Sequence, residues 1–267
     1  MIFAFDLDGV IYAGEVLLAG AVEAVTMARA LGHSTYFITN NSRQTPVELS
    51  VRLQSMGLDA APREIVSAVD SAGLLVSRIN GSPDSAMVIG SEALRQVIEN
   101  AGVRAYSYEE PGPFDVLVIG LDFGINYQKL LAAHRVLEQP NVHFVAVNND
   151  ATFGSEGGSV PGLGAIVSAV ASAAGRGPDI VAGKPEPHMF NRILELEGVE
   201  AGDLVVFGDS LYSDVGGAKA IGAKTALVLT GVDGREDVAS APPERSPDWI
   251  IESLENILFD EIAESRS

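Results

Sequence analysis

The sequence of 267 residues contains no cysteine. Without thiol groups the chain cannot form a disulfide framework or a thiolate metal site, so any metal ion would be held by oxygen or imidazole ligands. This composition is compatible with a cytoplasmic protein, and we expect a cytoplasmic location.

Long apolar runs are missing as well. The chain has no stretch of about 18 uninterrupted apolar residues, the length that a transmembrane helix needs. The amino terminus also lacks the basic segment of a secretory signal, because Asp6 and Asp8 follow so soon after Met1. We therefore expect a soluble chain that is not exported.

Positive charge is scarce. The chain has 17 lysine and arginine residues against 36 aspartate and glutamate residues, which gives a formal net charge of −19. This charge argues against binding to the phosphate backbone of nucleic acids and against adsorption to anionic membranes. An enzyme of such charge that acts on phosphate compounds must concentrate its positive charge at the site.

The sequence does contain a regular alternation of strand and helix signals, which is typical of a parallel sheet wrapped by helices. We predict strands at residues 2–5, 34–38, 65–68, 87–89, 116–121, 143–147, 204–207 and 224–229. We predict helices at residues 19–31, 46–57, 70–79, 92–101, 127–137, 164–174, 187–197 and 212–221, and a final amphipathic helix at 250–262. Breaks at Gly81-Ser82-Pro83 and in the glycine-rich segment from Gly154 to Gly164 bracket a middle block, which we interpret as a second domain inserted into the first.

Two carboxylates stand where the first predicted strand ends, in the sequence Asp6-Leu7-Asp8-Gly9. Open α/β sheets place their active sites at the carboxyl ends of their strands. Two anions so close together repel each other unless a cation lies between or beside them. The alternative is ordinary turn chemistry, in which Asp and Gly are common.

Small polar residues follow the next predicted strand, in the sequence Thr39-Asn40-Asn41-Ser42. Their hydroxyl, amide and backbone N–H groups could hold phosphate oxygens just before the helix that begins at Pro46. Capping of that helix is the alternative explanation.

Two further polar sites follow later in the chain. Lys184, one of only four lysines, stands in a rigid Gly-Lys-Pro loop, although a surface ammonium is the ordinary expectation for lysine. Asp209 follows the apolar run at 204–207, and Asp214 lies close behind it. These two carboxylates could converge on one cation, whereas the alternative is that they complement a helix dipole.

Taken in order, these sites resemble the four motifs of the haloacid dehalogenase superfamily: Asp6-x-Asp8-Gly9, Thr39, Gly183-Lys184-Pro185, and Asp209 with Asp214. The match spans nearly the whole chain. The segments 38–42, 145–152, 161–164 and 207–214 are similar to the class IIA branch, which contains NagD and p-nitrophenyl phosphatase-type enzymes. One difference is Asn149, where that family often has proline.

The resemblance implies a doubly wound, Rossmann-like α/β core with a parallel sheet over residues 1–81 and 169–267, and an inserted α/β cap of the class IIA type over residues 82–168. It also implies a phosphatase dependent on Mg²⁺ that hydrolyses small phosphate monoesters. In the family's mechanism Asp6 would be the nucleophile and would form an aspartyl-phosphate, and Asp8 would be the acid and base.

The same resemblance implies the binding groups. Mg²⁺ would be held by the Asp6 carboxylate, the Asp8 backbone carbonyl and Asp209, with Asp214 close by. The phosphate oxygens would be held by Thr39, Asn40, Asn41 and Lys184. In the cap, Asn148 and Asp150 are candidates for substrate specificity, and an Asx turn that caps a strand is the alternative role for them.

Other functions stay open at this point. A phospho-acceptor switch, or a small-molecule binding protein on the same fold, would gather similar residues without sustained turnover. A receiver-type switch, however, is one small domain and lacks the acid at the place of Asp8. A dinucleotide-binding protein needs a Gly-x-Gly-x-x-Gly turn after its first strand, which this chain does not have.

The expected partner is a small phosphorylated metabolite, such as glycerol phosphate, phosphoglycolate, a sugar or nucleotide phosphate, or pyridoxal phosphate. The resemblance also implies that a homodimer through the cap is possible, and the oligomeric state stays open.

Overall fold

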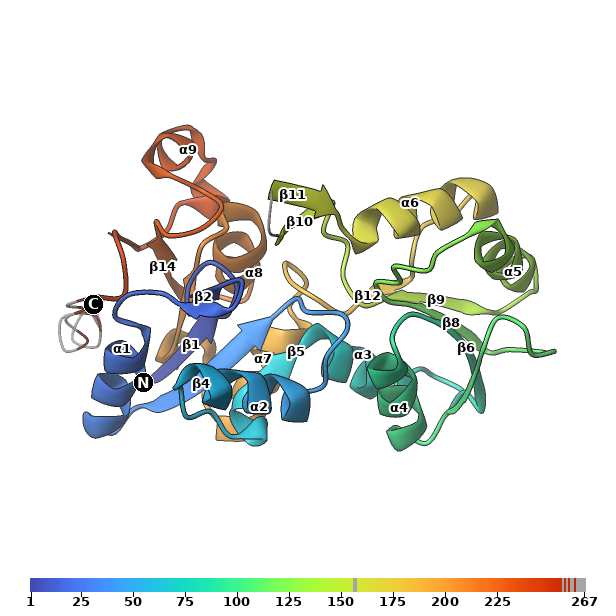
Figure 1. The fold of residues 1–267 in the computed structure, drawn as a ribbon, viewed down its shortest axis with the longest axis horizontal. Helices are drawn as coiled ribbons and strands as arrows, with labels where there is room; N and C mark the ends of the chain where they lie inside the picture. Colours follow the sequence, from blue (N-terminus) through green and yellow to red (C-terminus); the bar gives the residue numbers. More distant parts are fainter. Residues whose placement is uncertain (156–157, 256, 258, 260–261, 263–267) are drawn as a thin grey trace. The chain divides into compact units, whose positions relative to one another are not determined.

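The computed structural model describes residues 1–155, 158–255, 257, 259 and 262. The chain divides into two compact units, each with a sheet of its own (Figure 1). The first unit contains residues 1–39, 49–66 and 184–267, and the second contains residues 40–48 and 67–183. The domain boundaries predicted at 81/82 and 168/169 both fall within the second unit, and they stay a prediction.

A six-stranded sheet forms the centre of the first unit, in the order β15-β14-β13-β1-β4-β5. Its strands are β1 (Ile2–Asp6), β4 (Ser34–Thr39), β5 (Ile65–Ser67), β13 (Leu204–Gly208), β14 (Lys224–Val228) and β15 (Trp249–Ile251). The pairings from β15 through to β4 are all parallel, and β1 lies between β13 and β4. Every residue of β1 is buried, as its apolar sequence predicts for a strand in the middle of a parallel sheet.

The helices of the first unit are α1 (Ala21–Ala30), α2 (Pro46–Met56), α7 (His188–Glu197), α8 (Gly217–Ala220) and α9 (Arg235–Ser240). The first residues of α2 are counted with the second unit. Shorter elements are the hairpin β2 (Tyr12–Ala13) and β3 (Val16–Leu17), the 3₁₀ turns η1 (Pro62–Glu64), η2 (Ala201–Asp203) and η4 (Pro243–Arg245), and the π-helix η3 (Leu211–Gly216).

Aromatic side chains fill the core of the first unit. Phe3, Phe5, Phe37, Phe207 and Phe259 are all buried there. Phe5 stacks on Phe207, with ring centroids 4.8 Å apart. Burial of each such side chain contributes about 1.5–3 kcal/mol, so this cluster fixes the sheet whose strand ends carry the polar residues discussed below.

The second unit has a five-stranded parallel sheet in the order β12-β9-β8-β6-β7. Its strands are β6 (Ser85–Ile89), β7 (Arg104–Tyr106), β8 (Val116–Ile119), β9 (His143–Ala146) and β12 (Ile180–Val181). An antiparallel hairpin of β10 (Thr152–Ser155) and β11 (Gly158–Pro161) stands apart from this sheet. The helices are α3 (Ala68–Ser77), α4 (Glu92–Asn100), α5 (Tyr127–Leu137) and α6 (Leu163–Ala174).

The eight predicted strands are confirmed, and three other expectations need correction. The final helix predicted at 250–262 is wrong at its start, because Trp249, Ile250 and Ile251 pair with β14 as a strand. Residues 252–255 are not helical either, Phe259 and Ile262 are helical, and residues 256, 258, 260 and 261 lie outside the described part of the chain. The helix predicted at 212–221 is a π-helix followed by the single turn α8. The glycine-rich segment that we interpreted as a break in the chain contributes strand residues to the β10–β11 hairpin. In the described part of the chain, no helix combines the length and the apolar character that spanning a membrane requires.

Candidate active site

Three neighbouring strands of the first unit end in polar residues at the same edge of the sheet. Asp6 ends β1, Thr39 ends β4 and Asp209 directly follows β13. Because β1 pairs in parallel with both neighbours, these three carboxyl ends lie side by side. All three residues are buried, so the edge holds polar groups that are shielded from water.

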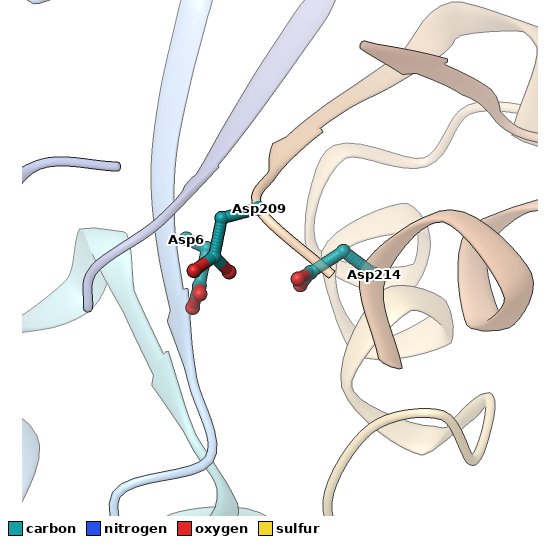
Figure 2. A group of neighbouring side chains, drawn as sticks. All are labelled: Asp6, Asp209 and Asp214. Carbon is teal, nitrogen blue, oxygen red and sulfur yellow. The ribbon is translucent and has the colours of Figure 1, made fainter. Parts of the chain in front are cut away.

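The carboxylates of Asp6, Asp209 and Asp214 form one group (Figure 2). Each offers an oxygen, and these oxygens all lie within 4.8 Å of one another. Asp214 comes from η3, which begins two residues after Asp209. The predicted convergence of Asp209 and Asp214 is therefore present in the structure. The Asp8 carboxylate lies outside the group, and the ligand predicted from Asp8 is its backbone carbonyl.

Glycine residues let neighbouring loops approach the Asp209 carboxylate closely. A Cβ atom at either Gly9 or Gly231 would collide with the Asp209 carboxylate. Gly9 also has a φ of +84°, a conformation that other residues rarely adopt. On the same side the backbone N–H of Val232 donates to Asp209 Oδ2 at 2.9 Å. Gly231 and Val232 were not anticipated from the sequence, because no local motif marks them.

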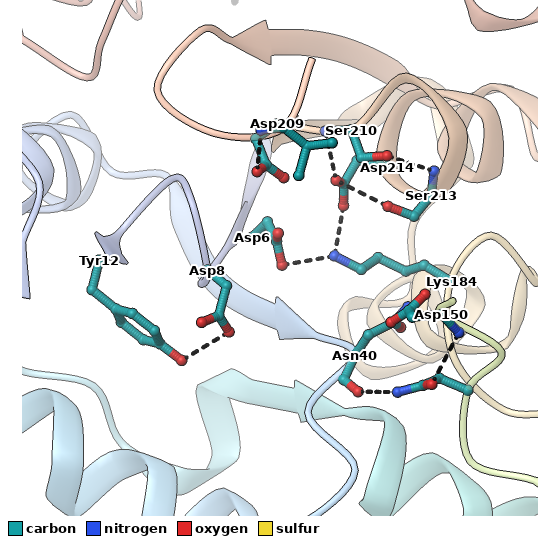
Figure 3. A network of polar contacts seen from close by, with 12 residues as sticks. Asp6, Asp8, Tyr12, Asn40, Asp150, Lys184, Asp209, Ser210, Ser213 and Asp214 are labelled. Atoms are coloured by element: carbon teal, nitrogen blue, oxygen red, sulfur yellow. Dashed lines mark hydrogen bonds and ion pairs between the residues drawn. The ribbon is translucent and has the colours of Figure 1, made fainter. Parts of the chain in front are cut away.

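Lys184 bridges two of the three carboxylates (Figure 3). Its Nζ atom donates to Asp6 Oδ1 at 2.7 Å and to Asp214 Oδ1 at 2.6 Å. The lysine side chain is only 2% exposed, so the ordinary expectation of a surface ammonium does not apply. Burial alone would lower the pKa of Lys184, but the charges of Asp214 and Asp6 outweigh it and raise the pKa.

The electrostatics of this group indicate an excess of negative charge. Burial raises the pKa of Asp6 well above its ordinary value, against the opposing charge of Lys184. Burial and the charge of Asp214 raise the pKa of Asp209 to about 7. Three ionised carboxylates and one ammonium would leave a net charge of −2, which one divalent cation balances. Mg²⁺ prefers such hard oxygen ligands, so the residues present fit that ion.

Asp8 has one direct hydrogen-bond partner, Tyr12, which is contacted in turn by Arg52, and neither residue is marked by a sequence motif. The Tyr12 hydroxyl donates to Asp8 Oδ2 at 3.1 Å (Figure 3), and Arg52 Nη1 donates to the same hydroxyl at 3.2 Å. Asp8 is exposed at the surface, yet desolvation by the protein packed around its carboxyl group raises the pKa, while the Tyr12 hydrogen bond and the Arg52 charge oppose this rise. No sequence signal links these residues, because Arg52 stands 40 positions from Tyr12.

The remaining predicted site residues belong to the second unit. Asn40 Nδ2 donates to both carboxylate oxygens of Asp150, at 3.1 and 3.0 Å (Figure 3). Asn148 Nδ2 donates to the Asn40 carbonyl at 2.6 Å, and Asn148 Oδ1 accepts from the Asp150 backbone N–H at 3.2 Å. This last contact is an Asx turn, the alternative role considered for Asn148. Asn41 Oδ1 accepts the backbone N–H groups of Arg43 and Gln44, both at 2.9 Å. Contact of these side chains with phosphate or substrate stays a prediction.

Comparison with protein families gives two matches that agree with this arrangement. A model described as haloacid dehalogenase-like hydrolase matches residues 3–104, and one described as HAD-hydrolase-like matches residues 181–257. Chronophin from Rattus norvegicus is 32% identical over 265 residues, which cover 95% of this chain and 85% of that protein.

Solved structures share the fold as well. The glycerol phosphate phosphatase from Mycobacterium tuberculosis, in complex with magnesium, is similar with a TM-score of 0.87 at 30% identity, covering 95% of this chain and 75% of that one. The p-nitrophenyl phosphatase from Archaeoglobus fulgidus has a TM-score of 0.85 at 33% identity, covering 95% and 96%. The chain therefore belongs to the haloacid dehalogenase-like hydrolases, in the class IIA branch of NagD, p-nitrophenyl phosphatase and chronophin, and it is a phosphoric monoester hydrolase of that type.

Proposed function

We propose that this chain is a Mg²⁺-dependent phosphatase that hydrolyses small phosphate monoesters through an aspartyl-phosphate on Asp6. The observation that carries the proposal is the pairing of buried Asp6 with buried Lys184. In a chain of net charge −19, this ammonium and the Mg²⁺ that the carboxylates would hold together offset the local negative charge that an anionic substrate would otherwise meet. The ammonium also favours the ionised form of Asp6, and only the carboxylate is a nucleophile.

The proposed reaction has two displacements at phosphorus. In the first, a carboxylate oxygen of Asp6 forms a bond to phosphorus while the bond to the leaving oxygen breaks, and Asp8 gives that oxygen a proton. In the second, Asp8 takes a proton from water, whose oxygen attacks phosphorus and releases the Asp6 carboxylate and inorganic phosphate. Asp8 thus returns to its protonated form at the end of each cycle.

Asp6, Asp209 and Asp214, with the backbone carbonyl of Asp8, would hold Mg²⁺. When bound, the ion supplies positive charge that reduces the repulsion between an anionic nucleophile and a phosphate dianion. The charge excess of the three carboxylates and the space that glycine leaves beside Asp209 support this assignment. The magnesium complex of the Mycobacterium tuberculosis relative supports it further.

We assign the binding of the phosphate group to Thr39, Asn40, Asn41 and Lys184. We assign selection of the leaving group to the second unit, with Asn148 and Asp150 as the candidate residues. The relatives include a glycerol phosphate phosphatase and a p-nitrophenyl phosphatase, so we propose a small phosphorylated metabolite as the substrate class.

A phosphate-release screen tests this proposal. The purified protein is incubated with Mg²⁺ and a broad panel of phosphorylated metabolites, and inorganic phosphate is measured over time. Sustained release well beyond one equivalent per protein supports a phosphatase. Release that stops at one equivalent, or binding without release, would support a phospho-acceptor switch or a binding protein instead.

A further inference from the structure

The loop that carries Asp8 is closed by its own backbone. The Leu7 carbonyl accepts the N–H groups of Ile11 at 2.9 Å and of Tyr12 at 3.0 Å, and the Gly9 N–H donates to the Tyr12 carbonyl at 2.8 Å. These bonds bring Tyr12 back beside Asp8, where the two residues also form an isolated β-bridge. The Tyr12 hydroxyl is thereby placed against one oxygen of the Asp8 carboxylate.

Arg52 holds this tyrosine from the other side. Its guanidinium carbon lies 4.4 Å from the centre of the Tyr12 ring, and its Nη2 atom donates to the Gly14 carbonyl at 2.7 Å. Tyr12 itself is fully buried. The ring therefore has no room to move its hydroxyl away from Asp8.

The direction of the hydrogen bonds follows from the chemistry of the donors. A guanidinium group can only donate, so the Tyr12 oxygen must accept from Arg52. Its single proton is then free to point to Asp8 Oδ2, the only other partner that the hydroxyl has in the described residues. Oδ2 is consequently an acceptor whether or not Asp8 is protonated.

We propose that Tyr12 and Arg52 are positioning residues for Asp8: they occupy its Oδ2 atom, and so Oδ1 is the atom that releases and takes up the catalytic proton. This inference rests on the proposed function, in which Asp8 is the acid and base. Without the hydroxyl, the carboxyl group could rotate and present its proton to either side. The proton would then point toward the leaving oxygen of the substrate in only a fraction of the enzyme–substrate complexes, and proton transfer would be slower.

The test compares two substrates that differ in their need for a proton. The phenolate of p-nitrophenyl phosphate leaves without much protonation, whereas the alkoxide of glycerol phosphate needs a proton. Tyr12→Phe removes only the hydroxyl, and general acid catalysis contributes about 10²–10⁴-fold, so we expect kcat/KM to fall roughly 10–100-fold for glycerol phosphate and less than about threefold for p-nitrophenyl phosphate.

The matched control is Tyr36→Phe. The Tyr36 hydroxyl also donates to a carboxylate, Glu197 Oε1, at 2.7 Å, and Tyr36 lies in β4 of the same unit. This variant should leave the ratio of the two substrates unchanged. An equal loss on both substrates in Tyr12→Phe, or no loss on either, would overturn the positioning role.

A second variant guards against a folding failure. Arg52→Met keeps an unbranched apolar side chain for the Tyr12 ring but removes the donor to its hydroxyl, and we expect the same substrate-dependent loss, smaller in size. Glu15→Gln removes only the exposed ion pair of Arg52, 3.1 Å long, and should change nothing. An Arg52→Met enzyme with the wild-type substrate ratio would contradict the role of Arg52.

A double variant shows whether Tyr12 acts through Asp8. In an Asp8→Asn background the proton is gone, so adding Tyr12→Phe should cause no further loss that depends on the leaving group. A further substrate-dependent loss would overturn the proposal. The activity of the wild-type enzyme separates a failure of the proposed function from a failure of this inference. A wild-type enzyme without sustained phosphate release contradicts both. An active enzyme in which Tyr12→Phe behaves like Tyr36→Phe contradicts only this inference.

Discussion

The ammonium group of Lys184 lies 2.7 Å from Asp6 Oδ1, and both side chains are buried at the carboxyl edge of the same sheet. The same ammonium also contacts Asp214 at 2.6 Å, so one positive charge serves two carboxylates. Removing it would leave both anions without their partner in a site shielded from water. Such losses are costly because a buried charge has no solvent to replace the missing partner.

We therefore expect Lys184→Met to abolish phosphate release and to lower the free energy of unfolding by about 3–5 kcal/mol in the presence of a chelator. Denaturant titration with and without Mg²⁺ measures this loss, and Mg²⁺ should restore part of it by offsetting the carboxylate charges. The control is Lys129→Met, which breaks an ion pair of the same 2.7 Å length with Asp122 at a more exposed position. Equal destabilisation by the two variants would show that the buried pairing of Lys184 has no special weight.

Metal dependence is the second prediction. A chelator should stop phosphate release and lower the thermal midpoint, because an ion that binds only the folded state stabilises it. Mg²⁺ should restore both properties. Ca²⁺ should restore the thermal midpoint without turnover, since its larger and looser ligand shell lets Asp6 coordinate in a geometry unsuited to attack. Full activity in chelator would contradict a metal-assisted mechanism.

Much of this site follows from sequence because its residues end apolar strands. The runs before Asp6 and Asp209 identify buried strands, and the parallel arrangement then brings their carboxyl ends together. The burial of Lys184 does not follow from its residue type, because its partners Asp6 and Asp214 come from distant segments. Contacts of that kind depend on tertiary packing. The contact between Arg52 and Tyr12 depends on packing in the same way, so the sequence does not predict it.

In the fold as well, some elements follow from the sequence and others depend on tertiary packing. The long apolar strands such as β1 and β13 are predicted well, since burial on both faces leaves a continuous hydrophobic run. The segment Trp249–Ile251 forms an edge strand of the sheet instead of the start of a helix, because pairing with β14 overrides its local pattern. The β10–β11 hairpin has a glycine-rich sequence that favours no regular element on its own.

The third prediction concerns the second unit. Asp150→Ala should change the ranking of natural substrates while altering turnover of p-nitrophenyl phosphate by less than about tenfold, which is roughly 1.4 kcal/mol in barrier height. Asn148→Ala should in addition lower the thermal midpoint, because both polar groups of this 5% exposed side chain are hydrogen-bonded. Steady-state kinetics over a substrate panel checks the ranking. A uniform loss on every substrate would mean that this loop supports structure and does not select the leaving group.

The fourth prediction is a pH dependence of stability at Asp115. Burial would raise the pKa of this carboxyl, but hydrogen bonds from Ser85 Oγ and from the Asp84 and Ser85 backbone N–H groups hold the pKa below its ordinary value. A lowered folded-state pKa stabilises the protein above the unfolded-state pKa of about 3.9, and this stabilisation is lost as the pH falls through the folded-state pKa.

Asp115→Asn should therefore lower the thermal midpoint at pH 7, and the difference from wild type should shrink below a pH of about 4. Thermal melts across this pH range measure it. Ser85→Ala, which removes only the side-chain donor, should have a smaller effect. A difference that stays constant down to acid pH would contradict the assignment of the stabilisation to the ionised carboxylate.

The proposed mechanism depends on a covalent intermediate on Asp6, which chemical trapping can detect. The enzyme is mixed with substrate and Mg²⁺, quenched in acid during turnover, and treated with borohydride, which reduces an acyl phosphate to an alcohol. Mass spectrometry of the amino-terminal peptide should then show homoserine in place of Asp6. Asp6→Asn should give no trapped product and less than about 1% of wild-type turnover, the scale of loss seen when a catalytic unit is broken. Sustained turnover by Asp6→Asn, or trapping at another residue during turnover by the wild type, would contradict the mechanism.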